Sequence, residues 1–161
     1  MRKLLTRRVL LKILLVEDEL HKREELTICL EQFFGRELEL EHLESVHDAF
    51  WAVSIEDFQL IILDMALPTF STEGATTQRG LDQALGGVEV LRTLKARGIK
   101  SNIIIITQYP DITVGGKVIK LASAAKILSD RYEQNVIGGI IYKYRSPSNN
   151  IRLINLLKKT I

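Results

Sequence analysis

KILLVEDE, residues 12–19, joins a continuous apolar run to three consecutive acidic residues. Three further apolar runs follow it along the chain: FQLIIL (58–63), NIIIIT (102–107) and GGIIYK (138–143). Each is rich in β-branched residues and too short for a buried helix, so all four are typical of parallel strands covered on both faces. The segment ELELEHLE (37–44) instead alternates apolar and mostly acidic residues, which predicts a strand at the sheet edge with one wet face.

Between these runs, apolar residues recur at helical spacing, so we expect one helix after each strand. The residues that define the five helices are Leu26, Cys29, Leu30 and Phe33; Ala49, Phe50 and Val53; Val88, Leu91 and Leu94; Val118, Leu121, Ala122, Ala125 and Leu128; and Leu153, Leu156 and Leu157. Ser148 or Asn149 can cap the last helix. Strict alternation of strand and helix predicts an α/β fold with helices on both faces of a parallel sheet. We expect a flavodoxin-like, doubly wound sheet of five strands in the order 2-1-3-4-5.

The 161 residues suffice for one domain with its own core, which we expect over residues 12–161, after a basic lead-in over residues 1–11. The net charge of +2 hides an uneven distribution, because five basic residues and no acid lie within residues 1–12 and the remainder is mildly acidic. A basic arm can contact nucleic acid, but we expect a solvated lead-in here and no nucleic-acid partner. The single cysteine, Cys29, fits a small buried residue in a reducing compartment. With no signal peptide or membrane span expected, we predict a cytoplasmic protein.

Polar groups lie at the ends of all four apolar runs. Glu17 and Asp18 follow the run that begins at residue 12, Asp64 follows residues 58–63, Thr107 ends residues 102–107 and Lys143 ends residues 138–143. One polar strand end means little, but carboxyl ends of neighbouring parallel strands meet at one edge, so these groups are expected to converge. Carboxylates that converge repel one another unless a cation lies among them. Hard oxygen ligands with open positions favour magnesium.

The segments KILLVEDE, LIILDMALP and IIIIT, with a lysine closing the fifth strand, resemble the receiver domains of two-component response regulators. The resemblance implies that Glu17 and Asp18 hold the metal together with Asp64 and the carbonyl of Ala66. It also implies that Asp64 accepts the phosphoryl group. Carboxylates do serve as nucleophiles in phosphoryl transfer, where positioning and charge neutralisation supply most of the catalysis.

By the same resemblance, Thr107 is the switch hydroxyl, Lys143 pairs with the phosphate, and Leu67 and Pro68 complete a D-x-x-L-P turn. Gly87 corresponds to the glycine that the family carries ahead of its next helix. The function implied is a phosphoryl-accepting signalling switch that catalyses only its own phosphorylation and dephosphorylation.

The partners implied are a sensor histidine kinase or histidine phosphotransfer protein as donor, and a downstream protein reached by direct contact. No membrane partner is implied, and homodimerisation is left open.

The sequence also departs from the family pattern. A long insertion, residues 69–86, separates Pro68 from Gly87, and we expect it to be a loop without regular structure beside the site. A second extension lies between Thr107 and Lys143, where YPDITVGG (109–116) precedes a fourth helix that we expect to be longer than usual. Tyr144, not proline, follows Lys143, so we expect a trans peptide bond between them. Family members carry an aromatic residue at the position of Ile140; Tyr142 lies on the same strand face and either replaces it or packs against the last helix.

Two alternatives remain open. One is a pseudo-receiver, an interaction module with this fold that signals without phosphorylation. The other is a magnesium-dependent phosphohydrolase or nuclease, which would need an acid or base in the pocket. The histidines His21, His42 and His47 are expected away from the strand ends, which argues against the second alternative.

Overall fold

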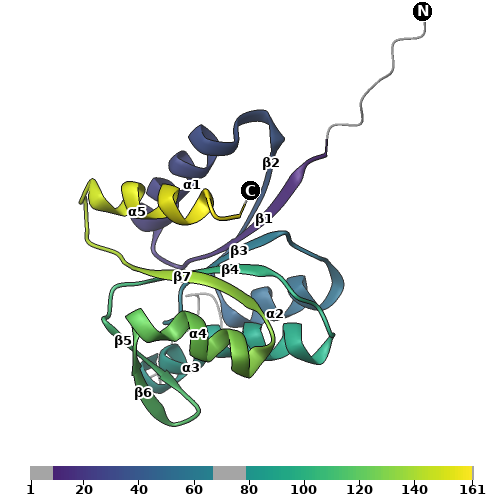
Figure 1. Ribbon diagram of the computed structural model, residues 1–161, viewed down its shortest axis with the longest axis vertical. Helices are drawn as coiled ribbons and strands as arrows, with labels where there is room; N and C mark the ends of the chain where they lie inside the picture. The colour runs from purple at the N-terminus through teal and green to yellow at the C-terminus, as the bar shows by residue number, and fades with distance from the viewer. Residues whose placement is uncertain (1–8, 67–78, 161) are drawn as a thin grey trace, which may run out of the picture.

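The central element of the computed structural model is a five-stranded parallel sheet in the order β2-β1-β3-β4-β7 (Figure 1). The structure describes residues 9–66 and 79–160, without the side chains of residues 79–85. The strands are β1 (Leu11–Val16), β2 (Leu38–Leu43), β3 (Leu60–Leu63), β4 (Asn102–Thr107) and β7 (Asn135–Ile141). This arrangement confirms the flavodoxin-like order, with the amphipathic β2 at one edge as expected. Strand β7 ends two residues before Lys143, so the prediction that Lys143 closes the strand was wrong by that margin.

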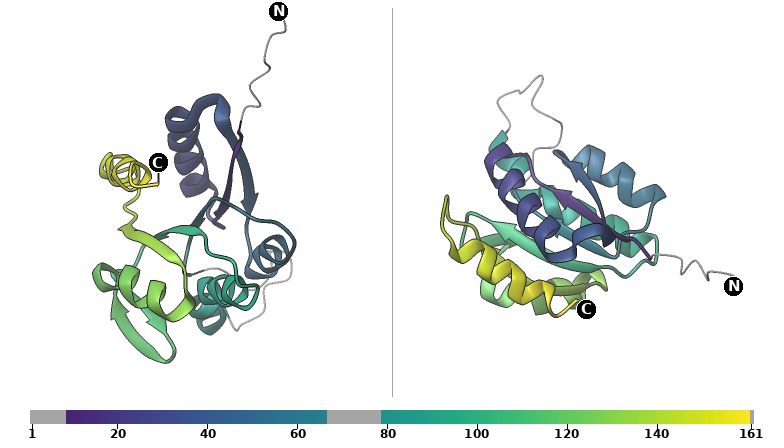
Figure 2. Two further views of the ribbon diagram at one scale, coloured as in Figure 1. Left: turned by 45° about the vertical axis from the view of Figure 1, so that its right-hand side comes forward. Right: turned by 90° about the horizontal axis from the view of Figure 1, so that it is seen from above.

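Helices cover both faces of this sheet. Their bounds are α1 (Leu20–Phe34), α2 (Val46–Ile55), α3 (Arg79–Ala96), α4 (Leu121–Tyr132) and α5 (Ser148–Leu157), with a short 3-10 helix η1 (Gly35–Glu37) after α1. Helices α1 and α5 contact each other over one face, and α2, α3 and α4 cover the other (Figures 1 and 2).

The strands divide the core into two layers by the alternation of their side chains. Along β1, Ile13 and Leu15 pack with the apolar residues of α1 and α5, whereas Leu14 and Val16 pack with those of α2, α3 and α4. The central strands β1 and β3 are buried on both faces. Because these strands are packed on both faces, the residues that follow their carboxyl ends are held in fixed positions.

Three details of the expected helices were wrong. Phe50 was assigned to the buried face of α2 but is 41% exposed, because Val46, Ala49, Ala52 and Val53 form that face. Neither Ser148 nor Asn149 caps α5; Pro147 occupies the cap position without a side-chain hydrogen bond. Val118 does not belong to α4.

Val118 lies instead in a hairpin that the sequence analysis missed. Strands β5 (Asp111–Val114) and β6 (Lys117–Lys120) pair antiparallel around Gly115 and Gly116, which both have positive φ angles of 57° and 77°. Two such residues between paired strands form the tight turn that favours glycine. The hairpin contacts α3 and α4, and helix α4 therefore begins only at Leu121 and buries Leu121, Ala124, Leu128 and Tyr132.

The insertion expected over residues 69–86 is in part helical, since α3 already begins at Arg79. The expectation of a structureless loop was therefore wrong for its last eight residues, and residues 67–78 lie outside the described residues. Gly87 lies within α3, where an added Cβ atom would come within 2.6 Å of the Met65 sulfur and 3.0 Å of the Asp64 carbonyl oxygen. Only glycine lets α3 approach the segment after β3 this closely.

Among the described residues, no helix is long and apolar enough to cross a membrane.

Candidate functional site

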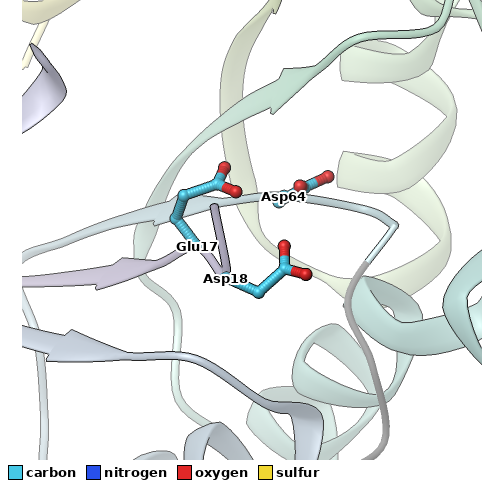
Figure 3. Close-up of side chains that lie close together, drawn as sticks. All are labelled: Glu17, Asp18 and Asp64. Carbon is cyan, nitrogen blue, oxygen red and sulfur yellow. The ribbon is translucent and has the colours of Figure 1, made fainter. Parts of the chain in front are cut away.

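Three carboxylates converge where β1 and β3 end (Figure 3). Glu17, Asp18 and Asp64 each offer one oxygen within 4.8 Å of the others. The backbone sets this geometry, because the amide of Asp64 donates to the Val16 carbonyl at 3.1 Å and the amide of Glu17 to the Leu43 carbonyl at 2.9 Å. Asp64 is 6% exposed and Glu17 1% exposed. The convergence expected of the three carboxylates is thus present.

A lysine that the sequence analysis did not single out completes the cluster. The ammonium group of Lys22, in the first turn of α1, lies 2.6 Å from Oε2 of Glu17 and 3.1 Å from Oδ2 of Asp64. Its side chain is fully buried, and it lies 5.5 Å from the centre of the Tyr142 ring. A signal for it was present in the sequence, since Lys22 precedes Leu26 by one helical turn and so continues the buried stripe of α1.

Burial and mutual repulsion shift the proton affinities of these groups. Burial, and then the charge of Asp64, raises the pKa of Glu17 to about 8, even though Lys22 opposes the shift. Burial and the Asp64 charge also raise the pKa of Asp18. Burial lowers the pKa of Lys22, but the Asp64 and Glu17 carboxylates outweigh it, and the net shift is upward. The cluster therefore holds more negative charge than one internal ammonium group balances.

A cavity of about 340 Å³ opens beside the cluster. Asp18, Asp64 and Ala66 line this cavity, and so does Thr107 at the end of β4. The hairpin contributes Ile112 to the wall. The amide of Ala66 donates to Oδ1 of Asp64 at 2.9 Å, which holds the carboxylate in place. The structure thus brings Asp18, Asp64, Ala66 and Thr107 to one cavity.

Lys143, unlike these four residues, does not line the cavity. Its side chain is exposed and makes no hydrogen bond or ion pair with any residue that the structure describes. Its backbone is held instead by Asn149, whose Oδ1 accepts from the Lys143 amide at 3.0 Å and whose Nδ2 donates to the Lys143 carbonyl at 2.6 Å. The peptide bond to Tyr144 is trans, as expected.

Tyr142 lies between the cluster and the turn that contains Lys143. It is buried, and its hydroxyl donates to Oε2 of Glu25 at 2.5 Å, while Nδ2 of Asn149 donates to Oε1 of Glu25 at 3.2 Å. Burial, and then the Glu25 carboxylate, raises the pKa of the Tyr142 phenol. Tyr142 thus lies in the layer between the sheet, α1 and α5.

The residues present fit a divalent metal of the magnesium type. The three carboxylates offer hard oxygen atoms, and half-buried Asp18 makes no ion pair in the described part of the chain. With all three carboxylates ionised, Lys22 offsets one of three negative charges. The remaining charge of two is the charge that a divalent cation carries.

The fold and the carboxylate cluster define a flavodoxin-like domain of the receiver type. No family model matches the chain. It is 31% identical over 123 residues to the Detocs response regulatory protein DtcB of Vibrio alginolyticus, covering 74% of this chain and 80% of that protein. It is 25% identical over 136 residues to the protein of the same name from Enterobacter cloacae, covering 84% of this chain and 91% of that one.

Solved structures agree on the fold. The response regulator domain of Thermotoga maritima CheB matches with a TM-score of 0.61 at 16% identity, covering 94% of this chain and 93% of that one. Thermotoga maritima TrrA, solved in complex with Mg(2+)-BeF, matches with a TM-score of 0.54 at 19% identity, covering 90% and 97%. The chain belongs to the response regulator family, as a receiver domain. This membership groups it with signalling regulators.

Proposed function

We propose that the protein is a phosphoryl-accepting switch in a phosphorelay, in which Asp64 is the acceptor and magnesium is required. The observation that carries the proposal is the position of Asp64. Its carboxylate lines a cavity together with Asp18, Ala66 and Thr107, and it lies within ligand distance of two further carboxylates. No other described group of three or more potential metal ligands has this geometry.

In the proposed reaction, a carboxylate oxygen of Asp64 forms a bond to the phosphorus of the donor, and the bond from phosphorus to the donor's leaving group breaks. The Ala66 amide keeps the carboxylate facing the cavity. The Thr107 hydroxyl lines the same cavity and donates a hydrogen bond to a phosphoryl oxygen. Glu17, Asp18, Asp64 and the Ala66 carbonyl would hold magnesium, which when bound neutralises charge on the transferred group.

The test is intact-mass spectrometry after incubation with acetyl phosphate and magnesium. We expect the protein to gain one phosphoryl group, and Asp64→Asn or chelation of magnesium to abolish the gain. The matched control is Asp57→Asn, because Asp57 is an exposed aspartate with an ion pair to Arg97, just before β3. Labelling of Asp64→Asn at the parent's rate would refute the choice of acceptor.

The metal assignment has its own test. Asp18→Ala removes a carboxylate that lines the cavity, so we expect magnesium affinity to fall at least tenfold by isothermal titration calorimetry. Unchanged affinity would refute the assignment.

As donor we propose a sensor histidine kinase or a histidine phosphotransfer protein, and as output a direct contact with a downstream protein. Support comes from the response regulatory proteins to which the chain is similar. Purified candidate donors carrying phosphohistidine should transfer to the parent and not to Asp64→Asn.

One observation favours a second candidate, a pseudo-receiver that signals without phosphorylation. Lys22 already supplies a cation to Glu17 and Asp64, the position where a metal would otherwise be needed. The two candidates differ in a single measurement. A pseudo-receiver of this kind shows no magnesium-dependent mass gain and no magnesium binding at millimolar concentrations.

A further inference from the structure

Two lysines, Lys22 and Lys143, are candidates for pairing with a phosphoryl group on Asp64. A transferred phosphoryl group adds a charge of about −1.5 to −2 next to Glu17 and Asp18, so a nearby ammonium group is needed to pair with it. The sequence pattern assigns that role to Lys143, whereas the structure has Lys22 in contact with Asp64.

We propose that Lys22, extending from α1, is the cation that pairs with the phosphoryl group on Asp64. The inference rests on the proposed function, since it concerns the phosphorylated form of Asp64. It assigns to a helix residue the contact that the sequence pattern gives to the end of the fifth strand.

The first argument is reach. The Lys22 ammonium lies 3.1 Å from Oδ2 of Asp64, while Oδ1 is held by the Ala66 amide. A phosphoryl group bonded to one carboxylate oxygen brings its own oxygens next to the other. A small movement of the ammonium group therefore brings it into contact with a phosphoryl oxygen. Because it has three N–H donors, it can retain its contact with the Glu17 carboxylate at the same time.

The second argument is desolvation. The Lys22 side chain is fully buried, so the cost of removing its charge from water is already met in the resting fold. Lys22 lies on the buried face of α1, and its ammonium nitrogen lies 5.5 Å from the centre of the Tyr142 ring. An exposed lysine such as Lys143 would have to lose both its hydration and its side-chain freedom to make the same contact.

The third argument concerns Lys143 itself. The Asn149 side chain hydrogen-bonds both the backbone amide and the backbone carbonyl of Lys143. The backbone at Lys143 is therefore held to the start of α5. Lys143 does not line the cavity beside Asp64, and its ammonium group makes no ion pair within the described ranges 9–66 and 79–160.

The test compares three lysine-to-methionine variants by their rate of phosphorylation from acetyl phosphate and by manganese affinity from electron paramagnetic resonance. For Lys22→Met we expect labelling at least tenfold slower than the parent. Manganese should bind severalfold more tightly to that variant, because three carboxylates lose their internal cation. A purely structural defect would weaken metal binding. Lys22→Gln, which keeps a donor for the carboxylates without the charge, should reproduce the slow labelling if Lys22→Met folds poorly by circular dichroism.

Lys12→Met is the matched control, because Lys12 also makes an ion pair, with Glu56, and lies over an aromatic ring, that of Phe58. Its labelling rate should stay within twofold of the parent. Lys143→Met is the rival arm and should remain within threefold. Slow labelling of Lys143→Met with parent-like labelling of both Lys22 variants would overturn the inference and leave the proposed function intact.

A measurement on the unaltered protein completes the test. On addition of magnesium and beryllofluoride, the side-chain ¹⁵N resonance of Lys22 should shift and that of Lys143 should not; the reverse pattern would also overturn the inference. A parent protein that shows neither labelling nor metal binding would overturn the proposed function, and the inference with it.

Discussion

Replacing Glu17 by glutamine should make the stability of the metal-free protein much less dependent on pH. The folded pKa of Glu17 is raised from 4.5 to about 8, chiefly by burial. The folded protein therefore keeps this proton to a higher pH than the unfolded chain, and the parent loses stability as pH rises from about 4.5 through 8. From pH 5 to pH 7 this single group lowers the free energy of unfolding by about 2 to 3 kcal/mol.

A carboxamide cannot ionise, so Glu17→Gln should lack that part of the slope. The assay is urea unfolding in chelator at several pH values, followed by circular dichroism. The control is Glu24→Gln, an exposed glutamate in the same helix as Lys22, which should keep the parent's slope. If the curves of the parent and Glu17→Gln run parallel from pH 5 to pH 7, the burial argument for Glu17 is refuted.

Three further substitutions test other parts of the fold by urea unfolding. Gly87→Ala should destabilise the protein by about 1 to 3 kcal/mol and slow the labelling of Asp64, because the new methyl group collides with Met65 next to the acceptor; parent-like behaviour would mean that the contact relaxes freely. Gly116→Ala should lower stability by about 1 to 2 kcal/mol, since φ is 77° there, and no loss would contradict the turn geometry. Tyr142→Phe should cost about 1 to 2 kcal/mol through the lost hydrogen bond to Glu25, and an unchanged midpoint would show that this bond is not net stabilising.

The strands were predictable because a strand that is buried on both faces requires a continuous run of apolar residues. A short β-branched run such as NIIIIT favours a strand over a helix, and its bounds agree with β4. The hairpin was missed although its signal was present. Val114 and Lys117 flank a Gly-Gly pair, and β-branched residues lie on either side of it, which is typical of a two-residue turn. Its strands have only four residues each, and the second of them was absorbed into the helix expected from Val118 onward.

The start of α3 was hidden for a different reason. Residues 79–86 include Gly80 and Gly86, which have low helix propensity, so local preference indicated a loop. Helix α3 nevertheless extends through them. Propensity is a weak guide where packing and helix continuation act on the same segment.

In the candidate site, some residues are placed by the backbone topology alone, whereas Lys22 reaches the site only through its long side chain. Parallel strands bring their carboxyl ends together whatever residues follow, so Glu17, Asp18, Asp64 and Thr107 could be grouped from their order in the sequence. The same argument failed for Lys143, which lies two residues beyond the end of β7 and does not line the cavity. Lys22 could not be grouped in that way, because its four-carbon stem carries the charge away from its own helix position. Its place on the buried stripe of α1 does predict that the charge must meet an acid inside the protein. A charged residue on an apolar helix face is therefore a site signal in its own right, and in this domain it identifies the cation nearest to the proposed phosphoacceptor.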